Sequence, residues 1–340
     1  GEDMRNLILE VNKNIELMNI ILLTSRYSEI LSERFGFKVD FVDYSNEKYI
    51  RDINDYFQKY SDHEIYIKLE EMIKDGFFLG RPMVFALALD NEEGADFKYE
   101  ISEFNIKLSG GIKKLEEFRV LFNSFKEETK FDDFFSKVEV YYKDDLEYFN
   151  RILEKYNFIN NLEEFSGNKN TNYNFVMSNL SKYNFGFDLN KDKEKYINIV
   201  FNLSIFLGDA IFIDNDYDIC NLIFHELSHP VINPLTESNL ALVNEYKEIH
   251  EELEKYKSEF SGYGDWEECV NEHIVRALSI HLSKKYFDID FTNRRIEFDY
   301  NLGYRYIKEI VSKLEEYEKN RNRYKSIEEF YPELIKVFVI

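Results

Sequence analysis

The sequence has little cysteine, proline and glycine, and these shortages narrow the classes of protein it can belong to. Only two of the 340 residues are cysteines, which is too few for a disulfide scaffold. Cys220 and Cys269 are therefore either two buried thiols or the two halves of one bridge. Four prolines and thirteen glycines leave few breaks in the chain, and helical spacing of apolar residues dominates its pattern.

Positive charges are fewer than negative ones, 43 Lys and Arg against 65 Asp and Glu, and long apolar runs are absent. The formal net charge of −22 at pH 7 repels phosphate backbones and anionic lipids, so we expect no nucleic-acid partner. No run approaches the roughly 20 apolar residues of a transmembrane helix, so we expect no integral membrane segment. The sequence has neither a GxxxxGKS/T phosphate loop nor the serine turn of an α/β-hydrolase.

The composition and the first residues bear on source and location. Asn, Lys, Ile, Tyr and Phe are abundant, which is typical of an AT-rich bacterial genome. The sequence opens Gly1-Glu2-Asp3-Met4, without an initiator methionine, which indicates that an export signal preceded it. We therefore expect an extracytoplasmic or secreted bacterial protein, and a cytoplasmic protein is the alternative.

The apolar pattern predicts an α+β, mostly helical fold. Helical spacing is clearest over residues 12–36, 62–76, 112–128, 265–287 and 303–321. Residues 196–214 have the pattern of two β segments around Gly208, and residues 166–174 are polar and turn-rich. We therefore expect a helical region over residues 1–165 and a second region over 166–340 that contains a small sheet. One continuous domain is the alternative.

The most informative stretch is NLIFHELSHPVINPL, residues 221–235, which contains His225-Glu226-x-x-His229. Side chains four residues apart on a helix share one face, so both imidazoles can bind one metal ion. Glu226 lies beside that face, where it can take a proton from a water activated by the metal. The apolar residues before the first histidine predict a half-buried helix. The alternative is a pair of histidines on an ordinary helix surface.

A catalytic zinc site needs a third protein ligand. Position 235 is Leu, so the short HExxHxxGxxH arrangement is excluded. The later stretch WEECVNEHIVRA supplies Glu272 as the predicted third ligand, with Glu268 in reserve. Arg276, one turn further on, could hold the carboxylate of Glu272, although the two could also be an ordinary surface pair. His273 is a weaker candidate, because it points toward the apolar stripe of this helix.

These residues carry a resemblance. His225-Glu226-x-x-His229 with Asn271-Glu272 on a later helix resembles the gluzincin branch of the zinc metallopeptidases. DICNLIFHELSHPVINPL followed by NEHIVRA, and more softly EVNKNIELMNIIL and SDHEIYIKLEEMIKDGF, look like a bacterial gluzincin-like family defined only as a domain of unknown function. The resemblance implies that residues 166–340 hold a zincin-like catalytic core. His225, His229 and Glu272 would then bind Zn²⁺, and Glu226 would be the general base.

Two features of the site stay open. Pro230 follows the second histidine, and proline disfavours helical geometry before it and lacks an N–H, so we expect the helix to end or kink at His229. A gluzincin also needs a donor to the developing oxyanion. Tyr263 and Tyr304 are the preferred candidates, and His281 and Tyr306 are further ones by position.

The sequence therefore predicts a zinc-dependent peptidase that acts on a peptide or protein substrate. One alternative is a non-catalytic binding protein on a bacterial surface that keeps a zincin fold. The other is a different zinc hydrolase, such as a cell-wall amidase.

Overall fold

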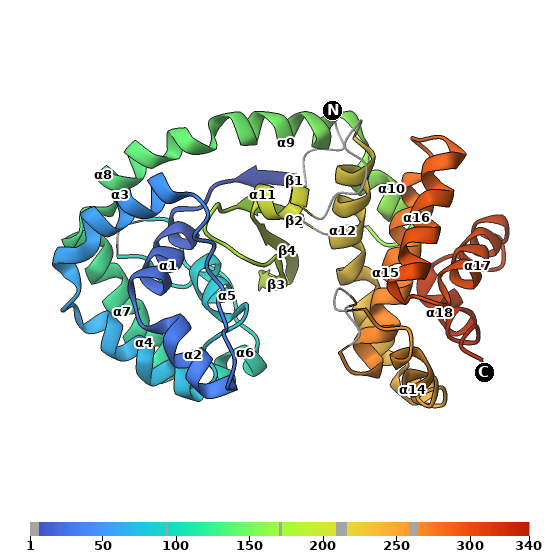
Figure 1. The fold of residues 1–340 in the computed structure, drawn as a ribbon, viewed down its shortest axis with the longest axis horizontal. Helices are drawn as coiled ribbons and strands as arrows, with labels where there is room; N and C mark the ends of the chain where they lie inside the picture. Colours follow the sequence, from blue (N-terminus) through green and yellow to red (C-terminus); the bar gives the residue numbers. More distant parts are fainter. Residues whose placement is uncertain are drawn as a thin grey trace. The chain divides into compact units, whose positions relative to one another are not determined.

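The computed structural model describes residues 7–92, 94–169, 172–208, 216–258, 261 and 264–339. The chain forms two compact units, each built from two stretches of sequence. Unit 1 comprises residues 1–151 and 171–209, and unit 2 comprises residues 152–170 and 210–340. Helices dominate both, and unit 1 adds one small sheet (Figure 1), which confirms the predicted α+β, mostly helical class. No described helix has both the length and the apolar character to cross a membrane.

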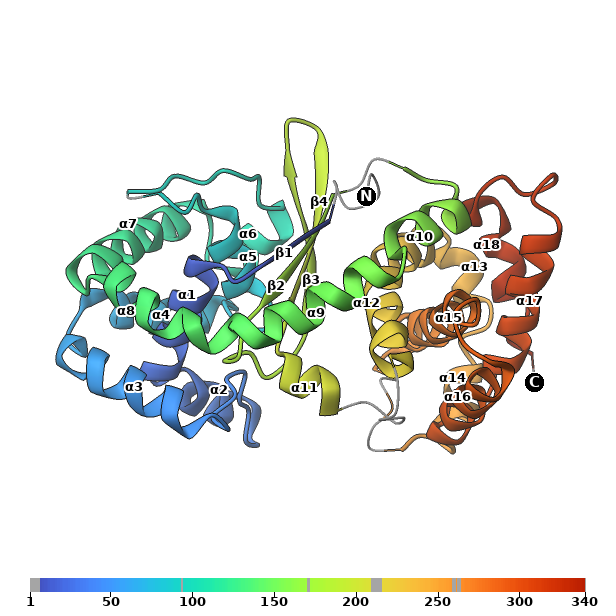
Figure 2. The same ribbon diagram turned by 90° about the horizontal axis from the view of Figure 1, so that it is seen from above.

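The sheet of unit 1 has four strands in the order β1-β2-β4-β3. Its strands are β1 Leu7–Glu10, β2 Asn172–Met177, β3 Phe185–Lys191 and β4 Glu194–Phe201. β1 and β4 both run parallel to β2, whereas β3 and β4 form an antiparallel hairpin (Figure 2). The hairpin turns at Asp192 and Lys193, both with positive φ, as a tight turn that follows the right-handed twist of a sheet requires.

The helices of unit 1 surround this sheet and begin and end at local signals. They are α1 Lys13–Thr24, α2 Tyr27–Phe35, α3 Glu47–Phe57, α4 Glu64–Asp75, α5 Arg81–Ala88, α6 Glu103–Leu108, α7 Ile112–Glu128, α8 Phe131–Val138, α9 Lys143–Lys155, which continues into unit 2, and α11 Leu203–Gly208; the 3₁₀ turns η2 Gln58–Tyr60 and η3 Glu139–Tyr142 lie between them. Asn12 caps α1, because its side chain accepts the N–H groups of Asn14 and Ile15. Gly36 and Gly76 end α2 and α4 in left-handed conformation, which costs glycine little.

The described residues of unit 2 form helices joined by loops, without a strand. Its helices are α10 Phe158–Ser166, α12 Tyr217–Ser238, α13 Leu240–Asn244, α14 Ile249–Glu254, α15 Trp266–Ser283, α16 Ile289–Leu302, α17 Ile307–Lys319 and α18 Ile327–Ile335. α12 and α15 lie side by side (Figures 1 and 2) and bury Ile223, Leu227 and Ile274. The buried hydroxyl of Thr236 on α12 donates to Asn271 Oδ1 on α15 at 2.5 Å, so a polar contact fixes the register of the two helices.

Two sequence predictions about this region are wrong in part. The helix does not end at His229, because α12 continues to Ser238 with Pro230 and Pro234 inside it, and the alternative of a kink at His229 stays a prediction. Each proline removes one backbone hydrogen bond, and packing against α15 holds the helix in place of those bonds. The first predicted β segment, which begins at Tyr196, is confirmed as far as Phe201, the end of β4. It is wrong from Leu203 onward, where the chain forms α11, because Asn202 Oδ1 caps that helix by accepting the N–H of Ser204. The second predicted segment, residues 209–214, lies outside the described residues.

The predicted division at residue 165/166 falls inside the stretch 152–170 that belongs to unit 2. The strands that follow it belong to unit 1, whereas α12 belongs to unit 2. The zincin-like core stays a prediction. Cys220 and Cys269 are both free and buried, so of the two alternatives for the cysteines, the buried thiols are present.

Candidate metal centre

The two histidines of the HExxH stretch lie on one face of α12. Their Nε2 atoms are 3.2 Å apart, and the side chains of His225 and His229 are 14% and 25% exposed. His229 Nδ1 lies 3.2 Å from Asn233 Oδ1, one turn further along the helix. Because that carbonyl oxygen can only accept, the proton of a neutral His229 sits on Nδ1 and its Nε2 lone pair faces the neighbouring ligand atoms.

The third residue of the cluster comes from α15. Asp265 caps this helix by accepting the N–H of Glu268 at 2.8 Å, and Glu272 follows two turns after the helix begins. Glu272 Oε1 lies 3.0 Å from His229 Nε2, and Oε2 lies 3.6 Å from His225 Nε2. The structure therefore brings together the three residues predicted as ligands, and they form a group that could hold a metal ion.

The spacing of the three ligand atoms suits a small tetrahedral ion. Atoms bound about 2.0–2.1 Å from a tetrahedral zinc lie roughly 3.3–3.4 Å from one another. The two Nε2 atoms are 3.2 Å apart. Each of them faces a different oxygen of Glu272, His229 Nε2 at 3.0 Å from Oε1 and His225 Nε2 at 3.6 Å from Oε2. These distances lie on both sides of the tetrahedral value. Two imidazole nitrogens and one carboxylate oxygen also form a donor set that zinc commonly takes in hydrolases.

The cluster has an unusual protonation pattern for three groups so close together. Burial lowers the pKa of His225 to about 3, so this imidazole is neutral and keeps a lone pair. Burial also opposes a charge on His229, but the hydrogen bond and the charge of Glu272 raise its pKa to about 9. The pKa of Glu272 lies well below its usual range, because the two histidines and Arg276 outweigh the effect of burial. A proton and a metal ion thus compete for the same lone pair.

Glu226 is half-buried on α12, beside the first histidine. Its negative charge is one of the causes that raise the pKa of His229, so the carboxylate acts on the cluster electrostatically. This placement is compatible with a general base that flanks the metal rather than binding it.

Behind Glu272 lies a buried group of charges that includes Arg276. Arg276 Nε is 3.4 Å from Glu272 Oε2, and its Nη1 donates to Asp299 Oδ1 on α16 at 2.8 Å. Asp299 also accepts from Arg295 Nε at 3.2 Å. The ring of Tyr304 packs 4.3 Å from the guanidinium carbon of Arg276, a cation–π distance. Arg276 therefore links the predicted ligand Glu272 to Asp299.

The other predicted site residues lie elsewhere. Glu268 is exposed and is not among the ligand atoms of the cluster. His273 is fully buried, with Nδ1 2.8 Å from the carbonyl of Cys269. Tyr304 is fully buried beneath Arg276, and its role as an oxyanion donor stays a prediction. Tyr263, the other preferred donor, lies outside the described residues.

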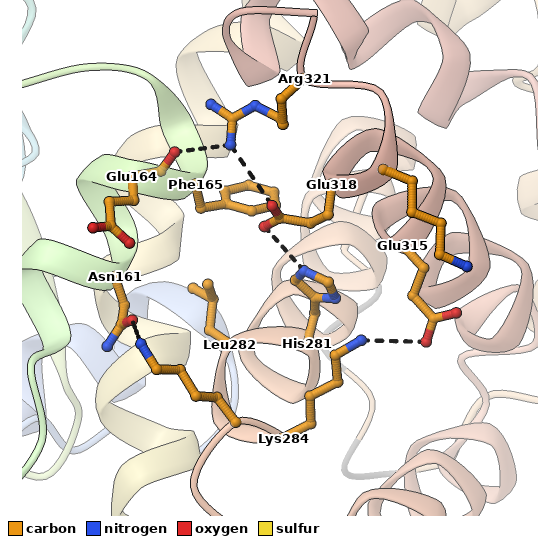
Figure 3. A pocket seen from close by; sticks show the side chains of 11 residues that line it. Asn161, Glu164, Phe165, His281, Leu282, Lys284, Glu315, Glu318 and Arg321 are labelled. Carbon is orange, nitrogen blue, oxygen red and sulfur yellow. Dashed lines mark hydrogen bonds and ion pairs between the residues drawn. The ribbon is translucent and has the colours of Figure 1, made fainter.

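The two further donor candidates make other contacts. Tyr306 donates its hydroxyl hydrogen to the carbonyl of Val339 at 2.5 Å. His281 lies in a separate cavity of about 600 Å³ between α10, the end of α15 and α17, where its Nε2 is 3.3 Å from Glu318 Oε1 (Figure 3). It follows Glu272 by nine residues on the same helix, which is half a turn away in direction and roughly 13 Å along the axis.

Sequence reasoning missed three residues near the cluster. Asn233 orients His229, and Asp299 holds Arg276. Asn221 lies one turn before His225, is 1% exposed, and neither end of its amide has a hydrogen-bond partner among the residues that the structure describes. The spacing of Asn221, His225, His229 and Asn233 at four-residue intervals could have indicated one continuous polar face. Asp299 carries no such signal, because it comes from a different helix.

Comparison with known proteins identifies the family. A family model described as "Domain of unknown function (DUF4932)" matches residues 7–337, so the chain belongs to that family. No curated protein and no solved structure matches the chain. The match spans nearly the whole chain, in agreement with the predicted membership of a family defined as a domain of unknown function, and the gluzincin relationship stays a prediction.

Proposed function

We propose that this member of the DUF4932 family is a zinc-dependent peptidase. The single observation that carries the proposal is the convergence of His225, His229 and Glu272 from two helices, with ligand-atom separations of 3.0–3.6 Å. Two of the three residues belong to an HExxH stretch, which supplies a general base at a fixed place beside them. The proposal includes an extracytoplasmic location and a peptide or protein substrate.

Each residue of the site would have its own role in the reaction. Zinc, when bound, would act as a Lewis acid and lower the pKa of a water molecule to about 7. Glu226 would accept the proton from the attacking water and return it to the leaving amine. Asn233 would keep His229 in the tautomer that offers Nε2. Arg276 would hold the carboxylate of Glu272 in place through its Oε2 atom.

The first experiment is the zinc content of the purified protein. We expect about one zinc per chain, and we expect His229→Ala to lose it, because two ligands bind zinc far more weakly than three. His250→Ala is a matched control, because His250 is also on a helix of unit 2 and its side chain is 24% exposed, against 25% for His229. The control should keep its zinc.

Two outcomes would contradict the proposal. One is a wild-type protein that binds no zinc after dialysis against a zinc salt. The other is a zinc content that His229→Ala and His250→Ala lower equally, which would place the ion elsewhere.

A further inference from the structure

Asp299 on α16 is a buried carboxylate that the proposed function does not use. It is 0% exposed and accepts hydrogen bonds from two guanidinium groups, Arg276 at 2.8 Å and Arg295 at 3.2 Å. A fully buried carboxylate is costly unless it is paired and hydrogen-bonded. The bonds from these two arginines explain how a buried Asp299 is tolerated. They do not explain why only one side chain, that of Arg276, separates it in space from the predicted metal ligand Glu272.

Arg276 links Asp299 to Glu272. Its guanidinium is planar with several donors in fixed directions, and the two carboxylates contact different edges of it. Nη1 reaches Asp299 at 2.8 Å, and Nε lies 3.4 Å from Glu272 Oε2. The other oxygen of Glu272, Oε1, is 3.0 Å from His229 Nε2. Oε2 also lies 3.6 Å from His225 Nε2. Arg276 therefore contacts the Glu272 oxygen that faces His225, and the other oxygen faces His229.

The charges in this group compensate one another only when Asp299 is present. The side chain of Arg276 is only 15% exposed. A buried cation next to a metal ligand repels a divalent ion, and low local polarity strengthens that repulsion. Asp299 supplies the opposing negative charge on the far side of Arg276. Without it, Arg276 would be drawn toward Glu272 and would compete with the metal for both oxygens.

We infer that Asp299 is a positioning residue for the metal ligand Glu272 and acts through Arg276. It orients the guanidinium and offsets its charge, so that Glu272 presents one oxygen to the ion. This inference rests on the proposed metal site. It goes further, because it assigns a role to a residue on a third helix, α16, whose carboxylate bonds Arg276 and Arg295 within the described chain.

The test is a double-mutant cycle on zinc affinity. Affinity is measured by competition with a chromophoric chelator for the wild type, Asp299→Asn, Arg276→Gln and the double variant. We expect Asp299→Asn to weaken zinc binding by about 10- to 100-fold, the usual effect of losing a partner of a metal ligand. In the Arg276→Gln background, the same substitution should change the affinity little, because the charge it opposes is gone.

Several results would overturn the inference. Unchanged affinity in Asp299→Asn is one, and an equal loss in both backgrounds is another, because a merely structural role does not depend on Arg276. A wild type that binds no zinc would remove the proposed site and this inference with it. Wild-type binding with an additive cycle would overturn the inference alone.

Two further variants test whether Asp299 acts on the position of Glu272 or only on the stability of the fold. Asp265→Ala removes the cap of α15 without touching Arg276, so it destabilises the same helix and should leave zinc affinity unchanged. If Asp299→Asn does not fold, Arg276→Lys keeps the charge but loses the planar fork. We expect it to weaken zinc binding by about tenfold, and a wild-type affinity there would overturn the inference.

Discussion

Two buried polar clusters, one in each unit, differ in how their groups are paired. In unit 1, Glu16 is 0% exposed and accepts from Tyr49 Oη at 2.5 Å and Ser178 Oγ at 2.6 Å. Ser178 in turn accepts from Asn19 Nδ2 at 3.0 Å. In this Glu16 cluster each acceptor faces a donor. In the metal cluster of unit 2, two imidazole nitrogens and a carboxylate oxygen face one another, and at least two of the three are acceptors.

The difference indicates which buried polar group is satisfied within the protein and which could hold an ion. Donors matched to acceptors satisfy a buried network without help. Converging acceptors are unfavourable unless a proton or a cation lies between them. The metal cluster also stays partly open, at 14–25% exposure of its three side chains, whereas Glu16 is closed. The predictions below test this contrast.

The largest expected effect is on hydrolysis by Glu226→Gln. The amide is nearly the same size but cannot accept the proton of the attacking water, so we expect a peptide-library assay to show a loss of about 10²- to 10⁴-fold. The zinc content should not change, since Glu226 is not a ligand. Glu237→Gln, an exposed position on the same helix, should keep its activity. Full activity in Glu226→Gln would show that Glu226 is not the general base.

The next effect is the removal of the metal. A ligand present at about 1,000 times its Kd stabilises the folded state by about 4 kcal/mol, so a strong chelator should destabilise unit 2 by an amount of that order. Hydrogen exchange should speed up in α12 and α15. In α1 and α3, which carry Glu16 and Tyr49, it should not change. Equal changes in both units, or none in α12, would contradict the assignment.

The smallest effect concerns pH and the Glu16 cluster. Burial raises the pKa of Glu16, so the folded protein keeps this proton at pH values where the unfolded chain has lost it. Stability is therefore lost as the pH rises from the ordinary glutamate value, about 4.3, toward the raised one. Glu16→Gln cannot ionise, so its stability relative to the wild type should improve with pH, by at most about 1.4 kcal/mol per unit.

Urea unfolding of both proteins across that pH range measures the difference. Comparing the two cancels the many other carboxylates of this acidic chain. If the stabilities of the two proteins changed with pH in parallel, the pKa of Glu16 would not be raised in the folded protein.

Local signals predicted much of this structure. The helix over 112–128 and the ends of two helices at Gly36 and Gly76 could be read directly, because helical periodicity and glycine at a helix end are local properties. Glu272 could also be found, because a zinc hydrolase needs a third ligand and a second helix presents few candidates. The residues of the candidate site could therefore be predicted where the chemistry of a metal site leaves few possible ligands.

What could not be predicted depends on contacts distant in sequence. β1 pairs with β2 across more than 160 residues, Leu7 opposite Tyr173, and no local pattern specifies that partner. Asp299 reaches Arg276 from another helix for the same reason. Pro230 misled the prediction because local propensity disfavours a helix there, whereas packing against α15 overrides it.

The prolines inside α12 have a consequence for the order of events during synthesis. Pro230 and Pro234 each cost about 3 kcal/mol in a helix interior, so the newly made stretch after His229 has little tendency to be helical alone. The helix that supports it, α15, is also the one that carries Glu272, and it emerges later. The same helix, α15, is therefore needed both to stabilise the end of α12 and to supply the third predicted ligand. Until α15 has been synthesised, the chain lacks the complete set of residues that could bind a metal ion.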